Sequence, residues 1–166
     1  MGEARNHAER KASLPDAGDS SRSQQAVTGT DPVRVLLVDA EPLQRSGWRL
    51  VIDSQDDLEV VGEAGDGVQA LALLRRVPVD VAVLDVRLPR MSGVQLAEKI
   101  AEDARVRLVQ RPPVTRVVLV SAVDLDHWEA AGDRLGASAV LPKDVEPERL
   151  LAAIRAAATE RRATTA

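Results

Sequence analysis

Apolar residues in this chain gather in short runs, and longer stretches with apolar positions at helical spacing separate the runs. Several runs are rich in valine and leucine and end abruptly at a polar residue, which is typical of strands buried on both faces of a sheet. The pattern predicts five strands, at residues 33–38, 58–64, 81–84, 116–121 and 138–143. It predicts five helices, at about residues 43–54, 67–76, 92–108, 125–135 and 147–161.

Strands that alternate with helices predict an α/β fold with a doubly wound parallel sheet, because parallel neighbours need helical crossovers. We expect the five-stranded, flavodoxin-like strand order 2-1-3-4-5, in which the first and third strands are neighbours. Pro142 predicts that the fifth strand lies at an edge of the sheet, since proline cannot donate a hydrogen bond to a strand ladder. The carboxyl ends of all five strands then share one edge, where ligands of such folds bind.

Four polar or charged side chains lie at the ends of the predicted strands: Asp39, Asp85, Ser121 and Lys143. Asp39 and Asp85 would face each other across the first and third strands, and two close carboxylates repel each other unless a cation is bound. Oxygen ligands without cysteine favour Mg²⁺ over zinc. A metal ion, a lysine and a hydroxyl group beside a carboxylate suit phosphoryl transfer to that carboxylate.

Each of these residues has a simpler explanation when it is considered alone. An aspartate suits a turn or a helix cap, and Ser121 would then be an ordinary hydroxyl at a strand end. Lys143 would be a solvated charge that protects an exposed sheet edge from aggregation. Four such residues on one edge favour a functional site instead.

Composition narrows the class of protein. The chain has 166 residues and a formal net charge of −4, without a cluster of basic residues, which argues against nucleic acid as the main partner. It has no cysteine, so disulfides, thiol catalysis and cysteine-bound metals are excluded. No apolar run is long enough for a membrane span, and we expect a cytoplasmic protein. Trp48 and Trp128 are the only aromatic residues besides histidine, which predicts an aliphatic core.

The pattern divides the chain into three parts. Residues 1–31 are polar and mixed in charge, and we expect a disordered N-terminal tail there. One domain should cover residues 32–160, and a short C-terminal tail should cover residues 161–166. This tail is too short for an output domain, so we expect a stand-alone module.

The strand ends, taken with the loops that follow them, resemble a response-regulator receiver domain over about residues 33–158. The CheY-like receivers of LuxR/NarL-type response regulators are the most similar, because the fifth strand ends in Leu-Pro-Lys-Asp. The matching pieces are Leu-Val-Asp39, Leu-Asp85 with Pro89 and Gly93, Ser121-Ala122, and Gly136-Ala137 before Lys143-Asp144.

This resemblance implies that Asp85 is the phosphoacceptor, Ser121 the switch hydroxyl and Lys143 the lysine that contacts the phosphate. It implies that Asp39, Asp85 and the backbone carbonyl of Arg87 bind Mg²⁺. A histidine kinase or a phosphotransfer protein would be the phosphodonor. The output would be contact with an unknown protein through the fourth and fifth helices, without enzymatic activity and without contact with nucleic acid or membrane, and the chain would be a monomer or a weak homodimer.

Three features depart from the pattern of this family. The family has two adjacent acids after the first strand, the second usually a direct metal ligand, and here Ala40 replaces it, which should weaken Mg²⁺ binding. Glu41 is a candidate replacement, although an acid at a helix N-terminus is also favourable by itself. Val140 replaces the usual aromatic residue on the fifth strand, which argues against a rotating-ring switch. The segment between Gly93 and Arg116 is longer than usual, which indicates a longer solvated helix end or a partner surface.

Two functions therefore stay open at this point. The first is a phosphoacceptor switch in a two-component phosphorelay, and the alternative is a pseudo-receiver that binds partners without being phosphorylated. Nucleotide binding through the glycines of residues 62–67 is disfavoured, because their spacing is GxxGxG and they follow the second strand. Trp128 lies on the apolar stripe of its helix, so we expect core packing rather than an interface role.

Overall fold

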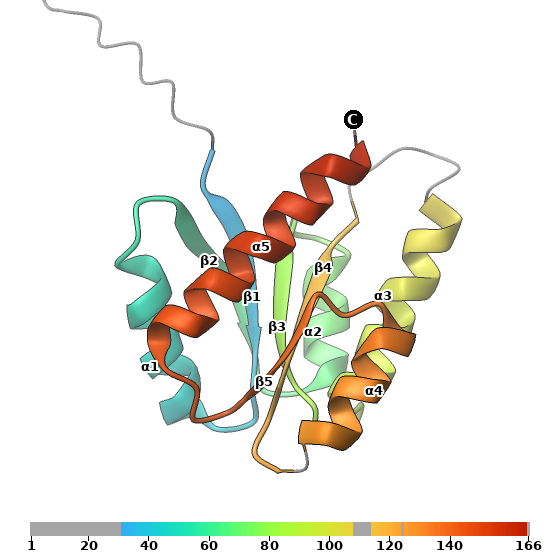
Figure 1. Ribbon diagram of the computed structural model, residues 1–166, viewed down its shortest axis with the longest axis horizontal. Coiled ribbons are helices and arrows are strands. Elements are labelled where there is room, and N and C mark those ends of the chain that lie inside the picture. Colours follow the sequence, from blue (N-terminus) through green and yellow to red (C-terminus); the bar gives the residue numbers. More distant parts are fainter. Residues whose placement is uncertain (1–30, 108–113, 124, 166) are drawn as a thin grey trace, which may run out of the picture.

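The computed structural model describes residues 31–107, 114–123 and 125–165, and it has one parallel sheet with helices on both faces (Figure 1). The strand order is β2-β1-β3-β4-β5 and every neighbouring pair is parallel, which confirms the predicted topology. The strands are β1 (Val33–Val38), β2 (Leu58–Ala64), β3 (Val81–Asp85), β4 (Arg116–Ser121) and β5 (Ala139–Pro142). The helices are α1 (Pro42–Asp53), α2 (Gly67–Leu74), α3 (Gly93–Arg107), α4 (Leu125–Leu135) and α5 (Pro147–Thr165).

Alternate side chains of the central strands point to opposite faces of the sheet and build two aliphatic cores. On β1, Val35 packs in the same cluster as Ile52 of α1 and Ile154 of α5. Its neighbour Leu36 packs in the cluster that includes Leu96 of α3. Helices α1 and α5 therefore cover one face, and α2, α3 and α4 cover the other (Figure 1).

Local sequence signals set the helix ends. A proline opens both α1 and α5, where its missing N–H would have no partner in any case. Asp66 caps α2, because its side chain accepts hydrogen bonds from the backbone N–H groups of Val68 and Gln69. Gly136 follows α4 with a φ of 67°, the left-handed conformation that glycine adopts most easily.

Several expectations about the outer parts of the fold can be compared with the structure. Pro142 ends β5, which lies at an edge of the sheet as predicted. Helix α5 continues to Thr165, beyond the end at about residue 161 that the sequence pattern predicts. Arg161 of this helix lies against the sheet, with its Nη1 atom 2.8 Å from Oδ1 of Asp80. Within the described ranges, no helix combines the length and the apolarity that a membrane crossing needs.

Two of the sequence predictions lie outside the described residues. Residues 1–30 of the N-terminal tail predicted at residues 1–31 are outside the described ranges, and so are residues 108–113 of the segment that was expected to be longer than usual.

A buried aspartate organises the edge of the sheet where the strands begin. Asp80 precedes β3, and Arg34 of β1 donates to it three times: its backbone N–H at 2.8 Å, Nε at 3.1 Å and Nη2 at 2.9 Å. Arg161 of α5 is the second cation on this carboxylate. The backbone of Asp80 also bonds to Arg34 and to Arg116. This one residue thus connects β1, β3, β4 and α5.

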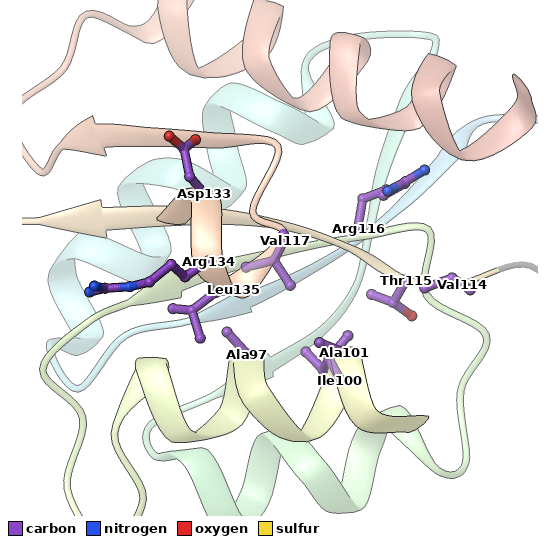
Figure 2. A pocket seen from close by; sticks show the side chains of 11 residues that line it. Ala97, Ile100, Ala101, Val114, Thr115, Arg116, Val117, Asp133, Arg134 and Leu135 are labelled. Atoms are coloured by element: carbon purple, nitrogen blue, oxygen red, sulfur yellow. The ribbon is translucent and has the colours of Figure 1, made fainter. Parts of the chain in front are cut away.

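The same edge carries a cavity of about 260 Å³ between α3, the start of β4 and the end of α4 (Figure 2). Ala97 and Ile100 of α3, Val117 of β4 and Leu135 form its apolar part. Thr115 closes one end, and its hydroxyl donates to the carbonyl of Val79. No residue that the sequence predicted as part of a site lies in this cavity.

Candidate acidic site at the carboxyl edge of the sheet

The structure brings the two predicted aspartates together at the edge where the strands end. In the register of the central pair, Val38 of β1 lies opposite Leu84 of β3, so Asp39 and Asp85 continue this pairing side by side. Both are buried, with exposures of 4% for Asp39 and 5% for Asp85. Ser121, at the end of β4, is 1% exposed. The predicted convergence of these residues on one edge is therefore present.

Lys143 supplies the positive charge of this site. Its Nζ atom donates hydrogen bonds to Oδ1 of Asp39 at 3.0 Å and to Oδ2 of Asp85 at 2.8 Å, and it also contacts Oε1 of Glu41 at 3.3 Å. Burial lowers the pKa of the Lys143 ammonium, but the hydrogen bonds and the charges of Asp85 and Asp39 outweigh burial and raise it. One ammonium thus faces three carboxylates, and the site has an excess of negative charge.

Backbone N–H groups orient both aspartates. Oδ1 of Asp39 accepts from the N–H of Glu41 at 2.8 Å, and Oδ1 of Asp85 accepts from the N–H of Arg87 at 2.9 Å. These are Asx turns, in which an aspartate bonds to the backbone two residues further on. Gly93 allows the loop after Asp85 to fold back, because a Cβ atom there would lie 2.1 Å from the carbonyl oxygen of Asp85. This close approach explains the glycine of the sequence motif.

Ser121 lies at the end of β4, and its hydroxyl is engaged with the backbone of the turn that follows. Oγ donates to the carbonyl of Val123 at 2.6 Å and accepts from the N–H of the same residue at 3.3 Å. The hydroxyl therefore closes the turn after β4.

The donors at the site are the hard oxygens that Mg²⁺ prefers. Asp39 and Asp85 offer carboxylates, and the buried Oδ2 of Asp39 lies 2.9 Å from Nζ of Lys143 as an ion pair. As arranged, no three histidine, cysteine, aspartate or glutamate side chains of the described residues lie close enough to hold a metal ion. The two aspartates fit a small hard cation, and a third acid is missing at the exposed Ala40.

Sequence analysis missed two supports of this site. Arg45 of α1 donates from Nη1 to the carbonyl of Asp39 at 2.6 Å, and only its position one helical turn after Glu41 could have indicated this. Arg90, in the loop after β3, forms an ion pair with Asp66 and has a positive φ of 64°. Since Asp66 also caps α2, this ion pair fixes the loop that follows Asp85.

Comparison with known proteins identifies the class. The family model of the response regulator receiver domain matches residues 35–155, and the chain belongs to this family. The transcriptional regulatory protein YxjL of Bacillus subtilis is 41% identical over 128 residues, which cover 77% of this chain and 55% of YxjL. The nitrate/nitrite response regulator NarP of Escherichia coli is 35% identical over 127 residues, which cover 76% of this chain and 55% of NarP.

Solved structures agree with this assignment. The signal receiver domain of NarL from Mycobacterium tuberculosis superimposes with a TM-score of 0.66 at 36% identity, covering 78% of this chain and 98% of that one. The resemblance to NarL-type receivers is therefore confirmed. The chain spans about half the length of the curated relatives it matches.

Proposed function

We propose that this chain is a phosphoacceptor switch of a two-component phosphorelay, with Asp85 as the acceptor. One observation carries the proposal: two buried carboxylates, Asp39 and Asp85, share one ammonium at the edge of the sheet where the strands end. Receiver domains of response regulators are phosphorylated by histidine kinases, and the family assignment supports a phosphohistidine donor.

The step is a transfer of one phosphoryl group. A carboxylate oxygen of Asp85 attacks phosphorus, the bond from phosphorus to the imidazole nitrogen of the donor breaks, and an acyl phosphate forms. The electron pair of the broken bond stays on the imidazole. Lys143 keeps its hydrogen bond to the acceptor and donates to a phosphoryl oxygen. Ser121 rotates from Val123 towards the same phosphoryl group, which changes the turn between β4 and α4.

The two aspartates and the backbone carbonyl of Arg87 are the groups that would hold Mg²⁺. The ion would neutralise negative charge on the carboxylates and on the phosphoryl oxygens. Asp39 would contribute a buried carboxylate that now pairs with Lys143, and the N–H of Arg87 holds Asp85 in orientation. Ala40 offers no oxygen in its side chain, so we expect binding to be weaker than in a site with two adjacent acids.

The output we propose is contact with another protein through α4 and α5. The turn closed by Ser121 leads directly into α4, so a rotation of its hydroxyl changes the start of that helix. Trp128 of α4 packs against the core formed with α2 and α3, which supports a structural role for this residue. We keep the expectation of a monomer or weak homodimer as part of the proposal.

A pseudo-receiver is the second candidate, and it also rests on specific observations. Ala40 removes an acid from the site, and the hydroxyl of Ser121 is already engaged with Val123. A chain of this kind would present a fixed surface to its partner. The two candidates differ in whether Asp85 is modified under ordinary conditions.

Intact-mass spectrometry separates the two candidates. The protein is incubated with Mg²⁺ and a small phosphodonor, beside Asp85→Asn and Ala40→Asp variants. The switch predicts a labile adduct of one phosphoryl group on the wild type, no adduct on Asp85→Asn, and faster labelling of Ala40→Asp. A wild type that stays unmodified while Ala40→Asp becomes labelled would establish the pseudo-receiver.

A further inference from the structure

Arg90 has a backbone conformation that side chains other than glycine rarely adopt. Its φ is 64°, and no other non-glycine residue in the described part of the chain has a positive φ. The N–H of Met91 donates to the carbonyl of Pro89 at 2.7 Å, so residues 89–91 form a γ-turn. A γ-turn with a positive φ at its central residue is rare and strained. Such strain persists only where the surrounding structure fixes it, and it is concentrated at functional sites.

Contacts with the start of α2 fix this turn. The guanidinium of Arg90 forms an ion pair with Asp66, whose side chain is 6% exposed against 58% for Arg90. Asp66 is itself held in place, because it caps α2 through two backbone N–H groups. Met91 lies against Gly67 so closely that a Cβ atom there would overlap its carbonyl oxygen. The outer end of the loop after β3 is therefore anchored on a helix.

The inner end of the same loop lies at Asp85. The N–H of Arg87 donates to Oδ1 of Asp85 at 2.9 Å. The N–H of Gly93 donates to the carbonyl of Val86 at 3.2 Å, so the loop leaves the end of β3 and returns to it. In a closed loop of this kind, the place of one N–H depends on where the rest is held. The hold on the outer part is the ion pair of Arg90.

We propose that Arg90 is a positioning residue for phosphoryl transfer. Its ion pair with Asp66 holds the loop so that the N–H of Arg87 keeps the Asp85 carboxylate oriented towards phosphorus. The reaction rests on the proposed function, whereas the hold on the loop does not. Stability alone does not account for the arrangement, because an ion pair with one exposed partner contributes little and the strained turn costs free energy.

Two variants remove the ion pair and keep the backbone. Asp66→Ser keeps an N-cap for α2, since serine caps a helix about as well as aspartate. Arg90→Asn places at the turn a residue that tolerates a positive φ better than most. NMR of the full chain labelled with ¹⁵N, without a phosphodonor, gives the rate at which the Arg87 amide exchanges with water. Each variant should raise it about fivefold, and the double variant no further, because the two residues act as one pair.

The second measurement is the rate at which the phosphoryl adduct forms on Asp85, followed by intact-mass spectrometry with a small phosphodonor. The rate should fall about fivefold in Asp66→Ser and in Arg90→Asn, because a displaced acceptor reaches the geometry of attack less often.

Asp57→Ser is the matched control. Asp57 precedes β2 and Asp66 follows it, so the two aspartates lie at opposite ends of one strand, and Asp57 also pairs with an arginine, Arg155. Removing this exposed pair should leave both the exchange of the Arg87 amide and the labelling rate within about twofold of the wild type.

Three results would overturn the inference. The first is an Arg87 amide that exchanges in both variants as it does in the wild type. The second is an equal acceleration for Arg87 and for core amides such as those of Leu36 and Leu119, which would indicate a general loss of stability. The third is faster exchange at Arg87 with an unchanged labelling rate. The proposed function fails separately, through absence of an adduct that depends on Asp85, and the exchange rates still test the hold on the loop.

Discussion

The two edges of the sheet both bury aspartate beside basic side chains, but the ratio of carboxylates to cations in direct contact differs. Where the strands begin, the single carboxylate of Asp80 meets two guanidinium groups, those of Arg34 and Arg161. Where the strands end, Asp39 and Asp85 share the one ammonium of Lys143, with Glu41 as a third acid.

We propose that this difference separates a structural cluster from a functional one. The carboxylate of Asp80 is saturated by donors from a strand and a helix, and it joins elements that are distant in the sequence. At the other edge, the excess of negative charge costs free energy in the absence of a ligand, because buried like charges repel. Such an excess persists in proteins mainly where a ligand or a reaction uses it. Charge balance, more than burial, therefore distinguishes the two edges.

The largest effect should come from Lys143→Met, which leaves Asp39 and Asp85 buried without a cation. We expect the free energy of unfolding to fall by about 3 kcal/mol, since uncompensated buried charges are strongly destabilising. Saturating Mg²⁺ should restore part of this loss, because it binds only the folded site. Urea unfolding with and without Mg²⁺ measures both effects.

Lys99→Met is the control for this prediction, because Lys99 lies exposed on α3. It should leave stability and its response to Mg²⁺ unchanged. The prediction fails if Lys143→Met is as stable as the wild type and Mg²⁺ does not change its free energy of unfolding. The buried carboxylates of Asp39 and Asp85 would then not destabilise the fold when Lys143 is removed.

Sequence analysis predicted the cluster of Asp39, Asp85 and Lys143 better than the cluster around Asp80. Asp39, Asp85 and Lys143 were found because each ends an apolar run, and parallel strands bring their ends together. The ion pair of Arg34 with Asp80 was not found. Its partners are 46 positions apart, and Asp80 precedes its strand, where no pattern distinguishes it from an ordinary turn residue.

Side-chain direction was the part that sequence could not predict. Glu41 was placed at a helix N-terminus, whose partial charge is about half a unit, but the full charge of Lys143 attracts its carboxylate more strongly. The hydroxyl of Ser121 points to Val123 because a neighbouring turn offers both an acceptor and a donor. The directions of these side chains depend on which hydrogen-bond and ion-pair partners the fold places next to them. The ion pair of Arg161 with Asp80 has the same origin, since the two residues meet only in the folded chain.

A smaller effect is expected from Asp80→Asn, at the edge where one carboxylate contacts two guanidinium groups. The free energy of unfolding should fall by about 2 kcal/mol at neutral pH, because two cations lose their carboxylate. The loss is limited because the Arg34 side chain is 37% exposed and partly solvated. Urea unfolding of the variant beside the wild type measures it.

Asp80 and Lys143 should stop contributing to the free energy of unfolding at opposite ends of the pH scale. Burial raises the pKa of Asp80, but hydrogen bonds from Arg34 and the charges of Arg161 and Arg34 outweigh burial and lower it. Its stabilisation is therefore present above the unfolded pKa of about 3.9 and is lost as the pH falls through the folded value. The pKa of Lys143 is raised, so its stabilisation is present below about pH 10.4 and is lost as the pH rises further.

Unfolding at several pH values tests this contrast. The difference between wild type and Asp80→Asn should shrink as the solution becomes acidic below about pH 4. The difference between wild type and Lys143→Met should shrink in alkali above about pH 10.4. A difference for Asp80→Asn that is constant down to the acid limit would mean that its carboxylate is not stabilised by the arginines.

The smallest effect should come from Asp57→Asn. This variant tests whether burial accounts for the contribution of the Asp80 cluster to stability. Asp57 accepts from Nε and Nη2 of Arg155, both at 2.7 Å, so its geometry is at least as good as that of the pair with Arg34. Its side chain, however, is 53% exposed, against 10% for Asp80. Exposed ion pairs are screened by water, so we expect a loss of only about 0.5 kcal/mol in urea unfolding. A loss equal to that of Asp80→Asn would mean that bidentate geometry, and not burial, makes an aspartate structural in this fold.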